Sequence, residues 1–310
     1  VLDTSIVNVA LDRISSALAA PVEGLQWVLS GYTLCFAALL LTGGWLGDRW
    51  SAKNVYLIGL GVFTFSSMLC GIAMNLPSLV AARAAQGVGA ALLVPCSLKL
   101  IDHANPDPAD RARAIGLWAV FGAIAMAAGP LIGGGIIDLL GWRSIFFVNA
   151  PIGIAGIAMT WRVSDQARST ARQSFDIAGQ GTAIIGLVST IGVLIEGQRA
   201  GWTSPSILIG MGMIPAAWAM FLIVEARQSF PMLPLQLFRN LVFSGCVYVS
   251  AASAFIFYGL LFILSLSFQQ TRHYTPLCTG LALLPMTIMI ALGSLTSASV
   301  ARVLGARRSM

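Results

Sequence analysis

Two ionisable residues stand inside apolar stretches of this sequence and are the first candidates for chemistry. Asp3 lies in an apolar run near the N-terminus, and Arg83 lies in a longer one. Ionisable groups are costly to bury, so they usually line a cavity or pair with one another. A carboxylate held away from water can load and release a proton at accessible pH. The residue types therefore indicate proton binding at Asp3 and a charge partner or relay at Arg83.

Each of these residues has a second interpretation. Asp3 stands two residues from where the sequence begins, so a missing start would place it nearer the lipid headgroups. Arg83 could be a structural arginine that bonds backbone carbonyls. The residue types alone leave both alternatives open.

The sequence gives little support for an enzyme. His103 and His273 are the two histidines, and both fall in expected connections on opposite sides of a membrane, which removes His-bridged metal sites and Ser/His pairs. The HExxH, P-loop and GxSxG patterns are absent. We expect no enzyme activity, no cofactor and no metal. The five cysteines stand singly in or beside apolar runs and are expected to be small core residues: Cys35, Cys70, Cys96, Cys246 and Cys278.

The elements that must position these residues are membrane helices. Of the 310 residues, 57% are hydrophobic and 10% are charged, whereas soluble domains carry about 25% charged residues. Predominantly apolar runs of about 20 residues recur without a period-two alternation, as from Val55 to Met74. Only helices satisfy every backbone group over such a run in lipid. The sequence therefore predicts an all-α, polytopic membrane protein within a lipid bilayer.

Charges and turn residues divide the chain into one partial and nine complete apolar spans. The partial span, Val1 to Leu11, is too short to cross a bilayer, so we expect the sequence to lack its natural start. Asp107 and Pro108 are expected to begin a helix, with Asp as the cap and Pro in the first turn. The complete spans are expected at 25–47, 54–74, 78–99, 114–137, 144–161, 177–195, 206–224, 241–268 and 277–299.

The basic residues are unevenly shared between the two sets of alternate connections. Of the 18 Lys and Arg, thirteen fall in one set, four fall in the other, and Arg83 lies within a span. Positively charged connections stay in the cytoplasm, so we expect the richer set and the N-terminus to be cytoplasmic, in a multi-pass protein of the cell (inner) membrane. Nucleic-acid binding would need this charge on one soluble surface and is not expected. The thirteen are Arg49, Lys53, Lys99, Arg111, Arg113, Arg162, Arg168, Arg172, Arg227, Arg239, Arg302, Arg307 and Arg308, and the four are Arg13, Arg143, Arg199 and Arg272.

Two further patterns are weaker when taken alone. One span contains Pro130 among several glycines, which allow close helix packing while the proline bends the helix and frees a carbonyl. A short connection at 43–54 places Asp48 between basic residues, where it can accept from helix N-termini or pair with arginines. Such a cluster can latch one conformation. Taken singly, these patterns favour close packing and an ordinary charged helix end. The glycines are Gly122, Gly129, Gly133, Gly134 and Gly135.

Taken together, five motifs resemble the major facilitator superfamily, and in particular its fourteen-helix drug:proton antiporters of the EmrB/QacA type. They are spread in the right order from residue 2 to residue 153. In chain order they are Leu2-Asp3-x-Ser5-Ile6-Val7-Asn8-Val9-Ala10-Leu11 (first helix), Gly44-x-Leu46-Gly47-Asp48-Arg49 (the connection after the second helix), Leu79-x-x-x-Arg83-x-x-Gln86-Gly87-x-Gly89-Ala90-Ala91 (fourth helix), Gly122 with Gly129-Pro130-Leu131-Ile132-Gly133-Gly134 (fifth-helix antiporter motif), and Trp142-Arg143-x-x-Phe146-x-x-Asn149-x-Pro151-x-Gly153.

The resemblance implies a transporter whose two helix bundles rock about a central cavity. It implies that protons drive the export of a small molecule, a drug-like apolar or cationic compound. Asp3 would take up the proton, and Arg83 would shift the protonation of a nearby carboxylate or relay charge. The antiporter motif, Gly122, Gly129, Pro130, Gly133 and Gly134, would shape the fifth helix and limit proton leak. Gly44, Asp48, Arg49 and Lys53 would close the cytoplasmic side, and Gln86, Gly87 and Gly89 complete the fourth-helix motif.

The sequence departs from these patterns in two places. Ser51 and Ala52 stand where the loop motif continues with Gly and Arg, which leaves the strength of the cytoplasmic closure open. Asp12 replaces the usual proline after the first motif, which leaves the end of the first helix open.

The second half fits the fourteen-helix group. Residues 301–308, Ala-Arg-Val-Leu-Gly-Ala-Arg-Arg, resemble a degenerate second copy of the loop motif, and the two spans between 177 and 224 are extra to a twelve-helix plan. We expect an N-terminal bundle at 1–162, two linker helices at 163–240 and the start of a C-terminal bundle at 241–310. On that plan about four helices are missing from the chain. A metabolite exporter or symporter on the same fold, or an inactive membrane fragment, are the alternatives.

Overall fold

The computed structural model describes residues 2–163, 176–228 and 233–304, without the side chains of 290, 291 and 294–304. Every regular element within these ranges is helical, as the composition predicts. In chain order they are α1 (Leu2–Leu18), α2 (Val22–Arg49), α3 (Ala52–Gly71), α4 (Leu76–Ala104), α5 (Pro108–Leu140), α6 (Ser144–Phe147), α7 (Asn149–Trp161), α8 (Ile177–Ala200), α9 (Pro205–Arg227), the 3₁₀ helix η1 (Leu235–Arg239), α10 (Leu241–Leu266), the π-helical turn η2 (Ser267–Thr271) and α11 (Pro276–Leu304).

The expected spans coincide with these helices. Within the described ranges, eight helical segments are long and apolar enough to cross a membrane, with α6 and α7 counted together and α10 extended through η2. The segment Pro276–Met289 of α11 is apolar but shorter. The predicted all-α, polytopic membrane fold is confirmed.

The first helix is longer than expected. α1 continues past Leu11 to Leu18, because Asp12 stands where a proline would remove a backbone donor and stop the helix. Arg13, expected in a connection, therefore lies on α1. Asp12 in place of the usual proline therefore allows this helix to extend beyond the motif.

The connection expected at 43–54 is almost entirely helical. α2 runs to Arg49 and α3 begins at Ala52, so only Trp50 and Ser51 join them. The Ser51 side chain accepts a hydrogen bond from the Asn54 amide at 3.4 Å and caps α3. A serine in place of the motif's glycine therefore supplies a helix cap.

Helix α5 begins as predicted. The Asp107 carboxylate accepts from the amides of Ala109 at 2.8 Å and Asp110 at 3.2 Å, and Pro108 occupies the first turn. These bonds satisfy amides that have no partner inside the helix.

Most of the basic residues expected in connections lie instead on helices, because the helices continue beyond the apolar spans. Arg168, Arg172, Arg307 and Arg308 lie outside the described residues, as does the end of the second loop-motif copy from Gly305 onward. The residues found on helices are Arg13, Arg49, Lys53, Lys99, Arg111, Arg113, Arg199, Arg227, Arg239 and Arg302.

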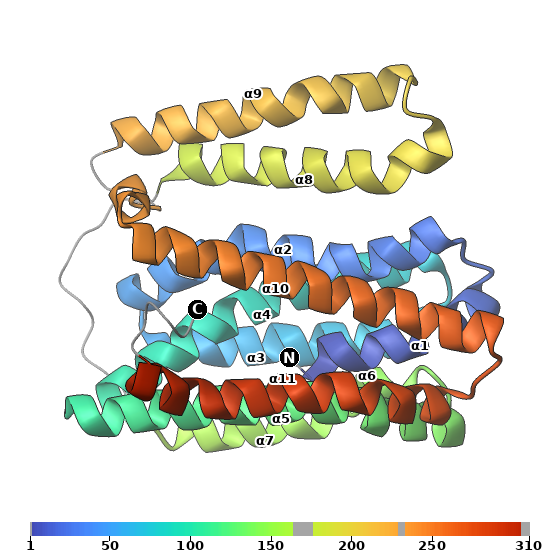
Figure 1. The fold of residues 1–310 in the computed structure, drawn as a ribbon, viewed down its shortest axis with the longest axis horizontal. Helices are drawn as coiled ribbons and strands as arrows, with labels where there is room; N and C mark the ends of the chain where they lie inside the picture. Colours follow the sequence, from blue (N-terminus) through green and yellow to red (C-terminus); the bar gives the residue numbers. More distant parts are fainter. Residues whose placement is uncertain (1, 164–175, 229–232, 305–310) are drawn as a thin grey trace. The chain divides into compact units, whose positions relative to one another are not determined.

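The chain forms two compact units, each assembled from helices that are distant in sequence (Figure 1). Unit 1 comprises Val1–Ala19, Asn105–Phe147 and Gln236–Met310; in it α5 packs against α1 and α11, and α1 also packs against α10. Unit 2 comprises Ala20–Ala104 and Val148–Leu235; in it α4 packs against both α2 and α3, α7 packs on α3, and α8 contacts α9 and α2.

Candidate functional site

Asp3 is buried in unit 1, with 6% of its surface exposed. The helix that carries it is buried on nearly all sides between Asp3 and Leu11, which is the pattern of a helix enclosed by others. The expected burial of this carboxylate is confirmed, and its role in proton binding stays a prediction. The buried residues of α1 are Asp3, Ser5, Ile6, Val7, Asn8, Val9, Ala10, Leu11 and Ile14.

Glycines of the antiporter motif bring α5 against this buried helix. A methyl group at Gly129 would collide with the Ser5 hydroxyl, and one at Gly133 would lie 2.9 Å from Cγ2 of Ile6. Side chains of α1 occupy the space that larger residues on α5 would need. Asp3 therefore belongs to a helix whose packing depends on two glycines of the motif.

A second face of α5 meets α11 at backbone distance. A methyl group at Gly134 would lie 2.8 Å from Cα of Leu277 and would press on the Pro276 carbonyl. In return, a methyl group at Gly280 of α11 would press on the carbonyl of Pro130. Each helix thus places a glycine against the backbone of the other. Gly280 is a contact residue that the motif did not predict.

The turn of α5 before Pro130 makes one more contact with α11, whereas Gly122 has no close contact with another described helix. Thr287 of α11 donates to the Ala127 carbonyl at 3.3 Å, about one turn before Pro130. A methyl group at Gly122 would meet no described heavy atom within 4 Å. The close packing expected of the motif is therefore confirmed at Gly129, Gly133 and Gly134, and it does not extend to Gly122.

Arg83 is buried in unit 2, with 1% of its surface exposed. Its Nε donates to the Val28 carbonyl of α2 at 3.3 Å, and its Nη1 donates to Oε1 of Gln86 at 2.6 Å. The guanidinium also lies 4.4 Å from the centre of the Tyr32 ring. These contacts match the structural interpretation, in which a buried arginine bonds a backbone carbonyl and ties α4 to α2.

The other residues of the fourth-helix motif hold α4 between its neighbours. Gln86 is fully buried and accepts from Arg83 and, at 3.8 Å, from Sγ of Cys70 on α3. Gly87 lies against the Tyr32 carbonyl of α2, while a methyl group at Gly89 would lie 2.8 Å from Cα of Phe63 on α3. The motif thus fixes two helix–helix contacts on opposite sides of α4.

The acidic residue of the loop motif, Asp48, forms its ion pair with a residue of α4. The Asp48 carboxylate forms an ion pair with Lys99 at 2.7 Å, and the same ammonium donates to the Gly44 carbonyl. The Arg49 guanidinium lies 5.6 Å from the Trp45 ring centre. The expected pairing of Asp48 with arginines is therefore replaced by a pair with a lysine.

Lys53 makes a different connection. Its Nζ donates to the carbonyls of Trp161 at 3.1 Å and Val163 at 2.7 Å. A cation at the carbonyl end of α7 satisfies acceptors that the helix leaves free and complements the helix dipole. Lys53 thus ties α3 to α7.

The last of the five motifs also packs α7 onto α3. The Asn149 amide donates to Oγ of Ser67 at 3.0 Å in a buried position, and a methyl group at Gly153 would lie 3.0 Å from Cβ of Thr64. Trp142, at the start of the same motif, lies in unit 1 beside Arg143, whose guanidinium is 4.3 Å from its ring centre. This motif therefore builds contacts in both units.

The predicted residues fall into two groups. Asp3 and the antiporter motif lie together in unit 1, and Arg83, the fourth-helix motif and the loop motif lie together in unit 2. No cluster of three metal-ligating side chains occurs among the residues described. The sequence did not single out five contact residues whose partners are distant in sequence: Lys99, Asp138, Ser265, Gln269 and Gly280.

The sequence pattern of the Major Facilitator Superfamily matches residues 1–310. The chain belongs to this superfamily. The predicted superfamily membership is therefore confirmed.

Drug-resistance proteins are among its relatives. The chain is 38% identical over 300 residues to the methylenomycin A resistance protein of Bacillus subtilis, covering 97% of this chain and 64% of that protein. The protein of the same name in Streptomyces coelicolor is 39% identical, covering 96% and 63%. Multidrug resistance protein Stp of Mycobacterium tuberculosis is 36% identical, covering 94% and 55%. The chain thus spans less than two thirds of these relatives.

A solved structure is also similar. The xylose transporter XylE from E. coli, in an inward-open conformation, is 12% identical, with a TM-score of 0.48 over 93% of this chain and 91% of that one.

Proposed function

We propose that this superfamily member exports drug-like apolar or cationic molecules across the membrane by alternating access, in exchange for protons. The relatives named as methylenomycin A resistance and multidrug resistance proteins support the choice of cargo class. The observation that carries the coupling is the buried carboxylate of Asp3 on α1, a helix packed against the glycine face of α5.

The proposed chemistry is one proton exchange at one carboxylate. In the proposed cycle Asp3 binds a proton when its cavity opens to the outer side and loses it when the cavity opens to the cytoplasm. Because a charged and a neutral Asp3 need different surroundings, the proton state would bias which side is open.

The glycine face of α5 supports such a cycle structurally. Gly129 and Gly133 meet α1, and Gly134 meets α11. Helices packed this closely leave little room for water, so this packing would keep protons from passing beside Asp3. Arg83 would act by holding α4 against α2 through Val28 and Gln86. The alternative role of Arg83 is to relay charge.

On the cytoplasmic side we propose a latch made by the end of α2 and the helix that follows it. Asp48 with Lys99, and Lys53 with the end of α7, join four helices of unit 2 at this end. The basic residues at these helix ends favour a cytoplasmic location.

The wider organisation follows the same proposal. The chain would be part of a fourteen-helix antiporter, with an N-terminal bundle at 1–162, linker helices at 163–240 and C-terminal helices from 241. Its N-terminus would be cytoplasmic, in the inner membrane of the cell.

Cellular resistance tests the cargo. The protein, expressed with any sequence that flanks this chain in its gene, should lower the accumulation of several cationic and neutral compounds in a pump-deficient host. Asp3→Asn should abolish this effect, while Asp12→Asn, a less buried carboxylate on the same helix, should retain it. Unchanged accumulation of every compound in the panel would overturn the proposed function.

A further inference from the structure

The end of unit 1 that carries Arg13 holds a polar contact that none of the five motifs explains. Asp138, near the C-terminal end of α5, lies 4.0 Å from Nη2 of Arg13 on α1. Its other oxygen accepts from the amide of Leu277 at 3.1 Å, in the first turn of α11. One carboxylate thus joins three helices from three distant parts of the sequence.

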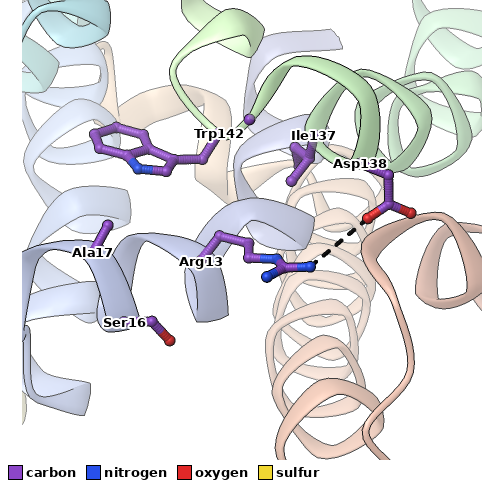
Figure 2. Close-up of a pocket in the computed structure, with 7 residues that line it drawn as sticks. Arg13, Ser16, Ala17, Ile137, Asp138 and Trp142 are labelled. Carbon is purple, nitrogen blue, oxygen red and sulfur yellow. Dashed lines mark ion pairs between the residues drawn. The ribbon is translucent and has the colours of Figure 1, made fainter.

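A pocket lies beside this contact. It has a volume of about 460 Å³ and is lined by α1, the end of α5 and the start of the Trp142 motif. Figure 2 shows the Arg13 side chain extending from α1 toward Asp138, with Ile137 and Trp142 around the same hollow. The polar contact therefore borders open space, where the helices have room to separate.

The same region of α1 is held by α10 through its backbone. The Ser265 hydroxyl donates to the Asn8 carbonyl at 2.7 Å, and the Gln269 amide donates to the Val9 carbonyl at 3.1 Å. Both side chains are buried, and Gln269 lies in the π-helical turn η2 and also donates to Ser265. Local π-helical turns are frequent at functional sites.

These contacts between helices are all polar. Hydrogen bonds join α1 and α5 to α10 and α11, beside the close glycine contacts of α5 with α11. One partly exposed ion pair joins α1 to α5 and holds Asp138 in place. Side-chain exposure is 54% for Arg13 and 24% for Asp138, and exposed ion pairs contribute little stability. These polar contacts can break and reform without leaving a large cavity.

We infer that Arg13, Asp138, Leu277, Ser265 and Gln269 form a releasable clasp that closes the outer end of the transport path. The inference rests on the proposed function for its sidedness, because Arg13 and Arg143 belong to the set of connections poorer in basic residues. In the proposed cycle, the clasp is made when the outer side is closed, and it opens when α10 and α11 move away from α1 and α5. Asp138 is its central residue because it contacts two other helices.

The clasp can be tested by thiol labelling, which does not depend on transport. Thr4 lies on α1 about 13 Å deeper along the helix axis than Arg13. The five natural cysteines are replaced by alanine, and Thr4→Cys is then labelled by a membrane-impermeant maleimide added to the outside of intact cells. Opening of the clasp should expose this thiol.

The variants separate the two contacts of Asp138. Asp138→Ala removes both contacts and should raise the outside labelling rate about tenfold, as expected for the loss of a hydrogen bond to a charged group. Arg13→Gln and Asp138→Asn remove the ion pair but keep an acceptor for Leu277, so each should raise it about threefold or less. Gln269→Leu should also raise it, through the other contact. Asp110→Ala, an exposed carboxylate on α5, is the matched control and should change nothing.

The outcomes are distinct. Graded increases in this order support the clasp, whether or not the protein proves to export drugs. Unchanged labelling in both Asp138→Ala and Gln269→Leu overturns it. An increase seen only in inverted vesicles overturns its assignment to the outer side and with it the proposed orientation.

Discussion

Lys99 of α4 forms a 2.7 Å ion pair with Asp48 at the end of α2 and also donates to the carbonyl of Gly44. A single ammonium therefore holds the last turn of α2 against α4. The Asp48 side chain is 56% exposed and that of Lys99 is 25% exposed, so the lysine is the more buried partner of the pair.

Replacing the lysine should cost more than replacing the aspartate. Asp48→Asn should lower the free energy of unfolding by about 0.2–1 kcal/mol, as for an exposed ion pair. Lys99→Met should lower it by about 1–2 kcal/mol, because the Gly44 carbonyl also loses its donor. Thermal unfolding of the purified protein in detergent measures both. A larger effect for Asp48→Asn would show that Lys99 is not the organising residue.

Glycines of the antiporter motif should differ in their tolerance of a methyl group. Gly134→Ala should destabilise the protein by about 1–3 kcal/mol, because the methyl group would meet the backbone of Pro276 and Leu277. Gly122 lies on the same helix, where a methyl group would meet no described atom within 4 Å. Gly122→Ala should therefore leave the stability unchanged or raise it slightly. Folded yield and thermal unfolding compare the pair. Equal effects would contradict the described packing of α5 against α11.

Arg83 should behave first as a structural residue. Lysine cannot reproduce a guanidinium that bonds Val28 and Gln86 and stacks on Tyr32. Arg83→Lys should therefore lower the unfolding free energy by about 1–3 kcal/mol. Arg227→Lys, at the exposed end of α9, is the control and should have little effect. Normal stability together with lost proton coupling would favour the relay interpretation instead.

The packing of α8 on α2 should depend on one buried amide. Gln180 of α8 accepts from Thr42 at 2.7 Å and donates to the Ala38 carbonyl, both on α2. Hydrogen bonds between membrane helices contribute about 0.6 kcal/mol each on average, so Gln180→Leu should cost about 1 kcal/mol. Gln198→Leu changes an exposed residue of the same helix and should cost less. Identical unfolding temperatures would indicate that packing alone holds α8 to α2.

The helices were predictable because each needs only a local apolar run. The start of α5 was predictable because its signal, the capping Asp107 followed by Pro108, is also local in sequence. The extension of α1 to Leu18 was missed, since apolar content ends at Leu11 while the helix continues until something stops it.

Partners across the fold were harder to predict. The motifs indicated that Gly134 and Asp48 matter, but nothing near them in sequence points to Pro276 or Lys99. Asp138 is similar, because its partners Arg13 and Leu277 lie more than a hundred residues away on either side. Such pairs depend on which helices become neighbours, and a hydrophobic pattern does not encode that choice.

The most direct test of the proposed coupling is proton movement in vesicles. Inverted membrane vesicles containing the protein, with any sequence that flanks this chain in its gene, are energised, and the release of protons on addition of a transported compound is followed with a pH-sensitive dye. The proposal predicts drug-dependent proton movement that Asp12→Asn retains and Asp3→Asn abolishes, with both variants present at equal amounts. Undiminished drug-dependent proton movement in Asp3→Asn would contradict the central role of this carboxylate.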